Sequence, residues 1–321
     1  MNDVRTGDLP TEQRNPRTID IDQLPTDEIV RLINAEELLV PALVAQAVPL
    51  MAQAVDLIVA RLRRGGTMHY FGAGTPARIA VMDAAELVPT YGIAPDLVVA
   101  HQAGGPAAGT KAIEGAEDDD AQGERDALAL SPDDVAIGIT ASGRTPYVAG
   151  ALRAAARGGA ETILVTANPN ASISRHARLT IAVDTGPEVI AGSTRMKAGT
   201  AQKLVLNCIS TAVMIKLGRT YSNLMATVQQ TNDKLSDRAV RILVEATGLD
   251  VDPCRTALAD AGGDLATALV MLLRQVSADE SGELLRQADG SVRQALAIGG
   301  DQTSGPPTDG RGDHSVSAVR L

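Results

Sequence analysis

Residues 67–75 read TMHYFGAGT, and this stretch decides the fold. Residues 67–71 have the length and apolar character of a short buried β-strand, and Gly72-Ala73-Gly74 is a small-residue turn. Residues 75–87 then repeat apolar side chains at helical spacing. The stretch therefore predicts a strand, a tight turn and a helix in direct succession.

The same succession recurs further along the chain. Residues 135–139 predict another strand, which is followed by the turn Ala141-Ser142-Gly143 and by a helix over 145–157. Near-continuous apolar strands that alternate with helices are typical of a parallel sheet covered on both faces. The sequence thus predicts an α/β, doubly wound parallel sheet, with further elements as follows: strands at 97–100, 162–166 and 179–183, and a long helix at 194–217.

The segments around this core predict the domain organisation. Residues 1–25 are polar and predict an extended arm, and residues 26–64 predict two helices that meet near position 40 and belong with the sheet in a domain over 26–235. Residues 236–297 are helical throughout and predict a small C-terminal all-helical domain. Residues 298–321 are rich in Gly, Pro, Ser, Thr and Asp without an apolar period, so they predict a disordered tail.

Composition excludes several classes of function. The 321 residues include 29 Lys and Arg against 39 Asp and Glu, a net charge of −10, so there is no basic excess to bind nucleic acid. No stretch approaches the roughly 18 uninterrupted apolar residues of a membrane span, and the N-terminus lacks a secretory signal. Cys208 and Cys254 match neither a disulfide framework nor a zinc spacing, which favours the cytoplasm. The histidines lack a close pairing, so no metal is expected.

Two predicted helix starts favour a phosphorylated ligand. Gly74 and Thr75 open the first helix, and the run Ser142, Gly143, Arg144, Thr145 opens the second. Free N–H groups and the dipole at a helix start attract anions, and the carboxyl ends of parallel strands are where α/β folds bind ligands. The alternative is that both turns are ordinary capped connections. Residues 72–77 also match the dinucleotide pattern G-x-G-x-x-[G/A], but the second strand lacks the acidic residue that holds a ribose at its end, so NAD is not expected.

Carboxylates supply the acid–base chemistry. Glu86 ends the helix predicted from Thr75, among apolar neighbours, a setting that favours a protonated carboxyl group and suits a general acid. Glu114 and Glu117 lie in an acidic segment, and physical reasoning alone does not choose between them.

Several motifs resemble the N-acetylmuramic acid 6-phosphate etherases, in order and over residues 10–297. They are TEQRNP (11–16), GAGT (72–75), DAAE (83–86), PTYG (89–92), AGG (103–105), EGAED (114–118), ASGRTPYV (141–148) and GSTRMKAGTAQK (192–203). The resemblance implies a sugar isomerase (SIS) domain followed by a small helical domain similar to ubiquitin-associated modules. It also implies a cytoplasmic homodimer, a phosphorylated amino sugar as ligand, and neither metal nor organic cofactor.

The resemblance further implies an activity and roles for residues. The family cleaves the D-lactyl ether of N-acetylmuramic acid 6-phosphate with water, by elimination and then hydration, in the recycling of cell-wall sugar. Carried across by motif, Glu86 is the acid for lactate departure and Glu117 is the base at C2, whereas Glu114 is structural. Phosphate is expected mainly at residues 142–145, with sugar contacts supported by Ser193, Thr194, Arg195 and Lys197.

This chain departs from the family pattern at one turn. It has Thr75-Pro76-Ala77-Arg78 where the family has Thr-Ser-Gly-Arg, which removes a hydroxyl group and a backbone donor and adds a methyl group. Two alternatives to the etherase remain at this point. They are a non-catalytic sugar-phosphate sensor, similar to the glucokinase regulatory protein, and an aldose–ketose isomerase on the same fold.

Overall fold

The computed structural model describes residues 10–111, 113–227 and 233–299, and the chain divides into two compact units. The first unit comprises Met1–Val88 and Ile93–Lys216, and the second comprises Pro89–Gly92 and Leu217–Leu321. The division after Lys216 comes earlier than the predicted boundary at residue 235. The predicted tail from residue 300 onward, and residues 1–9 of the arm, lie outside the described residues.

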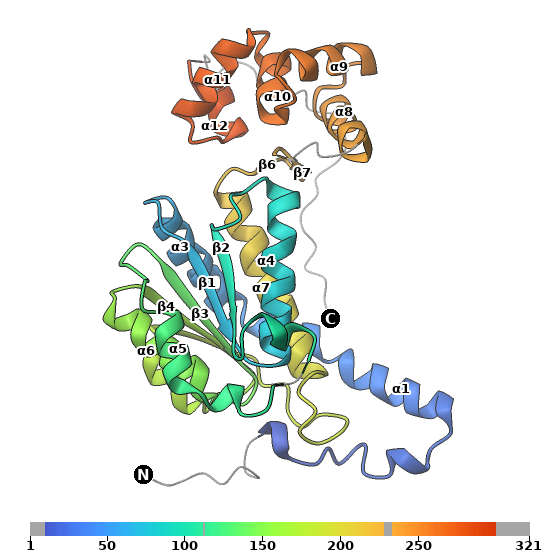
Figure 1. Cartoon of the computed structure of the whole chain (residues 1–321). Coiled ribbons are helices and arrows are strands. Elements are labelled where there is room, and N and C mark those ends of the chain that lie inside the picture. Colours follow the sequence, from blue (N-terminus) through green and yellow to red (C-terminus); the bar gives the residue numbers. More distant parts are fainter. Residues whose placement is uncertain (1–9, 112, 228–232, 300–321) are drawn as a thin grey trace. The chain divides into compact units, whose positions relative to one another are not determined.

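A five-stranded parallel sheet forms the centre of the first unit (Figure 1). Its strand order is β2-β1-β3-β4-β5, and every neighbouring pair is parallel. The predicted α/β fold is confirmed, and each predicted strand is present within two residues of its expected ends. The strands are β1 (Met68–Gly72), β2 (Val98–Gln102), β3 (Val135–Thr140), β4 (Glu161–Thr166) and β5 (Leu179–Ala182).

Helices cover both faces of this sheet. On one face, α6 (Pro146–Arg157) packs with α5 (Asp120–Asp126), and its Val148 and Leu152 are buried in one cluster with Phe71 and Leu164 of the strands. On the other face lie α3 (Val48–Leu62), α4 (Thr75–Tyr91) and α7 (Lys197–Lys216) (Figure 1). Because helices cover both faces of the sheet, its strands carry apolar side chains on both sides.

A buried carboxylate joins the second face to the sheet. Asp83 of α4 accepts the Tyr70 hydroxyl of β1 at 2.9 Å. Its other oxygen accepts Asn207 Nδ2 at 2.6 Å and Ser210 Oγ at 3.0 Å, both from α7. Because Asp83 is only 3% exposed, these bonds replace the water that it loses on folding.

Some helix bounds differ from the prediction. Residues 26–64 form three helices rather than two: α1 (Thr26–Glu37), α2 (Val40–Gln46) and α3. Pro41 and Pro49 lie in the first turns of α2 and α3, where a proline costs no hydrogen bond. The helix α4 continues past Glu86 to Tyr91, and α7 begins at Lys197 rather than at Thr194.

The described part of the N-terminal arm is hydrogen-bonded to residues 187–192. It contains two 3-10 turns, Pro10–Glu12 and Ile21–Gln23. In the first of them, the Thr11 carbonyl oxygen accepts the Gly192 N–H at 3.0 Å. Thr18 Oγ1 donates to the Val189 carbonyl oxygen at 2.8 Å. The arm therefore holds a loop that leads into α7.

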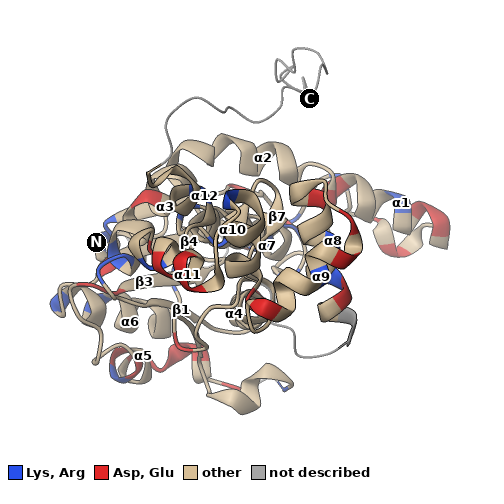
Figure 2. Ribbon diagram, turned by 90° about the horizontal axis from the view of Figure 1, so that it is seen from above, with Lys and Arg blue, Asp and Glu red and all other residues tan. Residues whose placement is uncertain are grey.

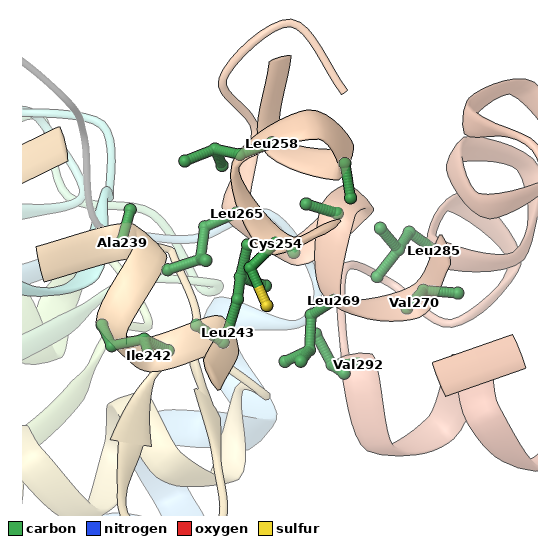
Figure 3. Close-up of a cluster of buried hydrophobic side chains, with 14 of the residues drawn as sticks. Ala239, Ile242, Leu243, Cys254, Leu258, Leu265, Leu269, Val270, Leu285 and Val292 are labelled. Carbon is green, nitrogen blue, oxygen red and sulfur yellow. The ribbon is translucent and has the colours of Figure 1, made fainter. Parts of the chain in front are cut away.

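In the part of the second unit that the structure describes, five helices follow a short antiparallel pair, β6 (Thr220–Tyr221) and β7 (Leu224–Met225). The side chains of Leu243, Cys254, Leu269 and Val292 are fully buried in its core (Figure 3). The helix at Ala278–Gln287 begins with a capping box between Ser277 and Glu280. The predicted C-terminal helical region is confirmed, and its helices are α8 (Asp233–Thr247), α9 (Val251–Asp260), α10 (Leu265–Arg274), α11 (Ala278–Gln287) and α12 (Val292–Ala297).

Two surface properties bear on partners. Acidic and basic residues are mixed along α9, which carries Asp252, Arg255 and Asp260 (Figure 2). Within residues 10–111, 113–227 and 233–299, no single helix has the length and apolarity needed to cross a membrane.

Candidate active site

A cavity of about 510 Å³ lies at the carboxyl ends of β1 and β3. The strand order reverses between these two strands, and open α/β sheets bind ligands at such a switch point. The cavity wall contains residues that follow each strand, together with residues from three other segments. Its lining is Ala73, Gly74, Thr75 and Pro76 after β1, Thr140 at the end of β3, Ala141, Ser142, Arg144, Thr145 and Pro146 after β3, and Glu12, Glu117, Asp118, Gly192 and Thr194.

The predicted phosphate loop is part of this wall. Thr145 is the residue before α6, and its hydroxyl shares a hydrogen bond of 2.8 Å with Thr140 Oγ1 rather than capping the helix. The Arg144 N–H donates to Ser142 Oγ at 3.3 Å. Hydroxyl and N–H groups are thus fixed at the start of a twelve-residue helix, an arrangement that suits an anion.

Gly143 belongs to the same loop but does not line the cavity. It is buried with φ +72°, a conformation that favours glycine. A Cβ at this position would lie 2.4 Å from the Ala171 Cβ, so a side chain here meets a close neighbour as well. Its N–H donates to Thr140 Oγ1 at 3.2 Å, which adds to the fixed shape of the loop.

The turn that departs from the family pattern also contributes to the wall. Gly74, with φ +60°, and Thr75 line the cavity, and α4 begins at Thr75 itself. Pro76 lines the cavity, but Ala77 is fully buried outside the cavity wall. The additional methyl group of Ala77 therefore does not narrow the cavity.

The two predicted catalytic carboxylates are in different places. Glu117 is exposed in the 3-10 turn Ala116–Asp118 and lines the cavity, as well as a neighbouring one of about 220 Å³. Glu114 lines only the smaller cavity. Glu86 lies outside both, exposed on α4 five residues before the helix ends at Tyr91. The apolar, helix-terminal setting expected for Glu86 is therefore wrong for the single chain, because its helix is longer and its side chain faces solvent.

The predicted sugar contacts near α7 are only partly at the cavity. Thr194 lines it, whereas Ser193 and Arg195 do not. Lys197 is 1% exposed, and its Nζ donates to Glu36 Oε2 at 2.9 Å. The structure thus places Lys197 in a buried ion pair rather than at the cavity.

Glu36 is the centre of a buried polar cluster. It accepts hydrogen bonds from Asn15 and Lys197, and a bidentate pair from Arg17. The Arg17 hydrogen bond is the main cause that lowers the pKa of Glu36 to about 2, and Lys197 and Asn15 add to it. The cluster ties the N-terminal arm and α1 to the start of α7.

Glu188 also holds the N-terminus of α7, through backbone hydrogen bonds. Its two oxygens accept the N–H groups of Lys197 at 3.0 Å and Ala198 at 2.9 Å. Its side chain is fully buried, and this burial raises its pKa. The loop between Glu188 and Lys197, which brings Gly192 and Thr194 to the cavity, is therefore held at both ends.

Sequence reasoning gave no role to Glu12, which the structure places at the cavity. Glu12 lies close to Gly192. A Cβ built on Gly192 would be 3.1 Å from Glu12 Oε2, and Gly192 has φ +77°, which also favours glycine. The only signal in the sequence was its place in the TEQRNP motif. A carboxylate distant in sequence from the sheet thus joins Glu117 at one cavity.

The histidines also differ from expectation. His69 Nδ1 and His101 Nε2, on adjacent strands, share a hydrogen bond of 2.9 Å, and the His101 ring stacks on Phe71. Burial is the main cause that lowers the pKa of His69 to about 4. Within the described residues, no group of three or more His, Cys, Asp or Glu side chains is placed to hold a metal ion.

The parallel sheet, with glycine- and hydroxyl-rich helix starts at its switch point, belongs to a sugar isomerase (SIS) domain, as two family models show. The SIS domain family model matches residues 110–212, and the model of the glucokinase regulatory protein N-terminal SIS domain matches residues 50–156. The chain belongs to the N-acetylmuramic acid 6-phosphate etherase family, as its similarity to proteins of that name shows. It is 61% identical to the one from Thermobifida fusca, over 82% of this chain and 87% of that protein. It is 50% identical to the one from Pectobacterium atrosepticum (92% and 98%) and 47% identical to the one from Serratia proteamaculans (91% and 99%).

Proposed function

We propose that this protein cleaves the D-lactyl ether of N-acetylmuramic acid 6-phosphate, giving N-acetylglucosamine 6-phosphate and D-lactate. The observation that carries the proposal is the 61% identity to an etherase over most of both chains. The cavity supports it, because an anion-binding helix start and the carboxylate of Glu117 lie on one wall.

The reaction begins with the sugar in its open form. The phosphate binds at Ser142, Arg144 and Thr145, which are on the cavity wall. The C1 aldehyde acidifies the proton on C2, and Glu117 removes it. The lactate oxygen leaves C3 with a proton, which forms a double bond between C2 and C3. Water then adds at C3 and the proton returns to C2, so that the atoms balance as ether plus water to alcohol plus lactate. Acid and base groups contribute roughly 10²–10⁴-fold each in such reactions.

Glu86 is the proposed acid for lactate departure, and we propose that it reaches the cavity of a second copy in a homodimer. In the single chain Glu86 lies outside the cavity, one helical turn after Met82 of α4, which is 45% exposed. In a site shared between two protomers, this surface of α4, with an exposed apolar side chain near Glu86, would pack against the second copy.

The proposed location is the cytoplasm, and the proposed role is the recycling of cell-wall amino sugar. Two cysteines without a disulfide, Cys208 and Cys254, fit a reducing compartment.

The decisive experiment incubates the purified protein with N-acetylmuramic acid 6-phosphate and assays D-lactate enzymatically. Release of D-lactate is expected. Well-folded protein that binds the sugar phosphate without releasing lactate would instead be a sensor, and one that converts an aldose phosphate to a ketose phosphate would be an isomerase.

The composite site has its own test. We expect Glu86→Ala and Glu117→Ala each to be inactive alone. After the two are mixed and allowed to exchange subunits, half of the dimers are mixed and each has one complete site, so about a quarter of the parent activity returns. A mixture that forms mixed dimers and stays inactive would contradict a site shared between protomers.

A further inference from the structure

We propose that the smaller cavity binds the D-lactyl group, and that Lys111 and Arg78 bind its carboxylate. This proposal rests on the proposed etherase function and names the part of the site that recognises the leaving group. The smaller cavity, of about 220 Å³, is lined by Ala73, Gly74, Arg78, Ala103, Ala108, Lys111, Ile113, Glu114, Gly115, Ala116 and Glu117.

The two cavities are neighbours that meet at the proposed base, Glu117. They share Ala73, Gly74 and Glu117 on their walls. The proposed base acts at C2, and the ether oxygen is on the adjacent carbon, C3. A sugar whose phosphate lies at Ser142–Thr145 and whose C2 lies at Glu117 therefore has its lactyl oxygen next to the boundary between the cavities. The smaller cavity is then the adjoining space for the lactyl group.

Charge also separates the two cavities. The larger wall carries three acidic residues, Glu12, Glu117 and Asp118, and one cation, Arg144, which the proposed function assigns to the phosphate. The smaller wall carries Glu114 besides Glu117, but it also carries two cations, Arg78 and Lys111. A lactyl carboxylate beside Glu117 needs a cation, and with Arg144 assigned to the phosphate, Arg78 and Lys111 are the cations that the two walls leave for it.

Arg78 both forms the cavity and organises the loop that carries Lys111. Its Nε donates to the Gly109 carbonyl oxygen at 3.1 Å, and its Nη2 donates to those of Ala108 at 3.0 Å and Lys111 at 3.4 Å. Among the residues that the structure describes, Arg78 Nη1 and Lys111 Nζ have no hydrogen-bond or ion-pair partner. A carboxylate in this cavity would provide one for each.

The rest of the wall suits the remainder of the lactyl group. Ala103, Ala108 and Ile113 place apolar carbon in the cavity, where a methyl group is favourable. An isomerase substrate has neither this methyl group nor the carboxylate, so the smaller cavity distinguishes the proposed etherase substrate from a simple sugar phosphate.

The test compares Lys111→Gln with the parent enzyme on two ligands. A charged hydrogen bond of this kind predicts a loss of roughly 10- to 100-fold in kcat/KM for D-lactate release. The dissociation constant of N-acetylglucosamine 6-phosphate, which lacks the lactyl group, is expected to change less than twofold by calorimetry. The matched control is Lys216→Gln, at the exposed end of α7 and outside both cavities, which is expected to leave both values unchanged.

A second substrate, in which a carboxamide replaces the lactyl carboxylate, completes a double-mutant cycle between enzyme and substrate. The parent enzyme is expected to lose about as much with this substrate as Lys111→Gln loses with the natural one, and the variant is expected to lose little more. An unchanged kcat/KM in Lys111→Gln, or an equal weakening of both ligands, would overturn the lactyl site. Failure of the parent enzyme to release D-lactate would instead overturn the proposed function.

Discussion

The substitution Glu36→Gln tests the buried cluster that holds the arm against α7. It removes the negative charge but keeps the shape, so Lys197 Nζ, in a side chain 1% exposed, loses its counter-charge. Removing one partner of a buried ion pair costs about 3–5 kcal/mol. The pKa of Glu36 gives a similar figure, because a fall from 4.5 to about 2 corresponds to about 3 kcal/mol. We therefore expect the first unit to lose about 3 kcal/mol of unfolding free energy.

Urea unfolding followed by circular dichroism at neutral pH measures this loss. The matched control is Asp27→Asn, which breaks the exposed pair with Arg31 (3.6 Å, side chains 68% and 80% exposed) and should cost less than about 0.5 kcal/mol. The pH dependence has a definite sign. Because the native pKa of Glu36 is lowered, its contribution is fully present above pH 4.5 and is lost as the pH falls towards 2. Glu36→Gln should lack this part of the acid sensitivity.

A double variant separates the charge from the packing. Glu36→Gln with Lys197→Met removes both charges of this ion pair, so it should be more stable than Glu36→Gln alone by at least about 1 kcal/mol. A cost below about 1 kcal/mol for Glu36→Gln, or no recovery in the double variant, would refute the account of Lys197 as a buried ion-pair partner.

Three further predictions concern the site. Glu117→Gln should slow exchange of the C2 proton with deuterated water by roughly 10²–10⁴-fold in NMR, and exchange at the parent rate would exclude Glu117 as the base. Thr145→Ala should weaken N-acetylglucosamine 6-phosphate binding by about three- to tenfold in calorimetry, and unchanged affinity would mean that the phosphate lies elsewhere. Gly143→Ala should lower the unfolding free energy by more than Gly65→Ala does. Both glycines have positive φ, but only at Gly143 would a Cβ meet a neighbour, Ala171, whereas Gly65 has open space; equal losses would disprove the contact.

The sheet was predictable because its signals are local. Each strand is an apolar run whose ends are marked by glycine, polar or small residues within the same few positions. The break at Ala47 was not visible in the same way, because α2 and α3 continue one apolar helical period across it. The end of α4 was also misplaced, since the helix passes through Pro89 and ends at Tyr91.

The site was predictable only where its residues follow the strands. Thr75, Ser142, Arg144 and Thr145 belong to strand–helix connections, so the fold alone brings them together. The position of Lys197 depends on Glu36, which is 161 residues away in sequence, and no local pattern indicates that pairing. Glu12, Arg78 and Lys111 are likewise placed by contacts between distant segments, and Glu86 has no place at the cavity within one chain.

The two cysteines give each unit its own chemical reporter. Cys208 is exposed on α7 of the first unit, whereas the Cys254 side chain is fully enclosed in the core of the second (Figure 3). An alkylating reagent should therefore modify Cys208 in the native protein at once, but Cys254 only when the helices around it separate. The rate of Cys254 modification then measures the opening of the C-terminal helices, and the natural chain needs no engineered label for this measurement.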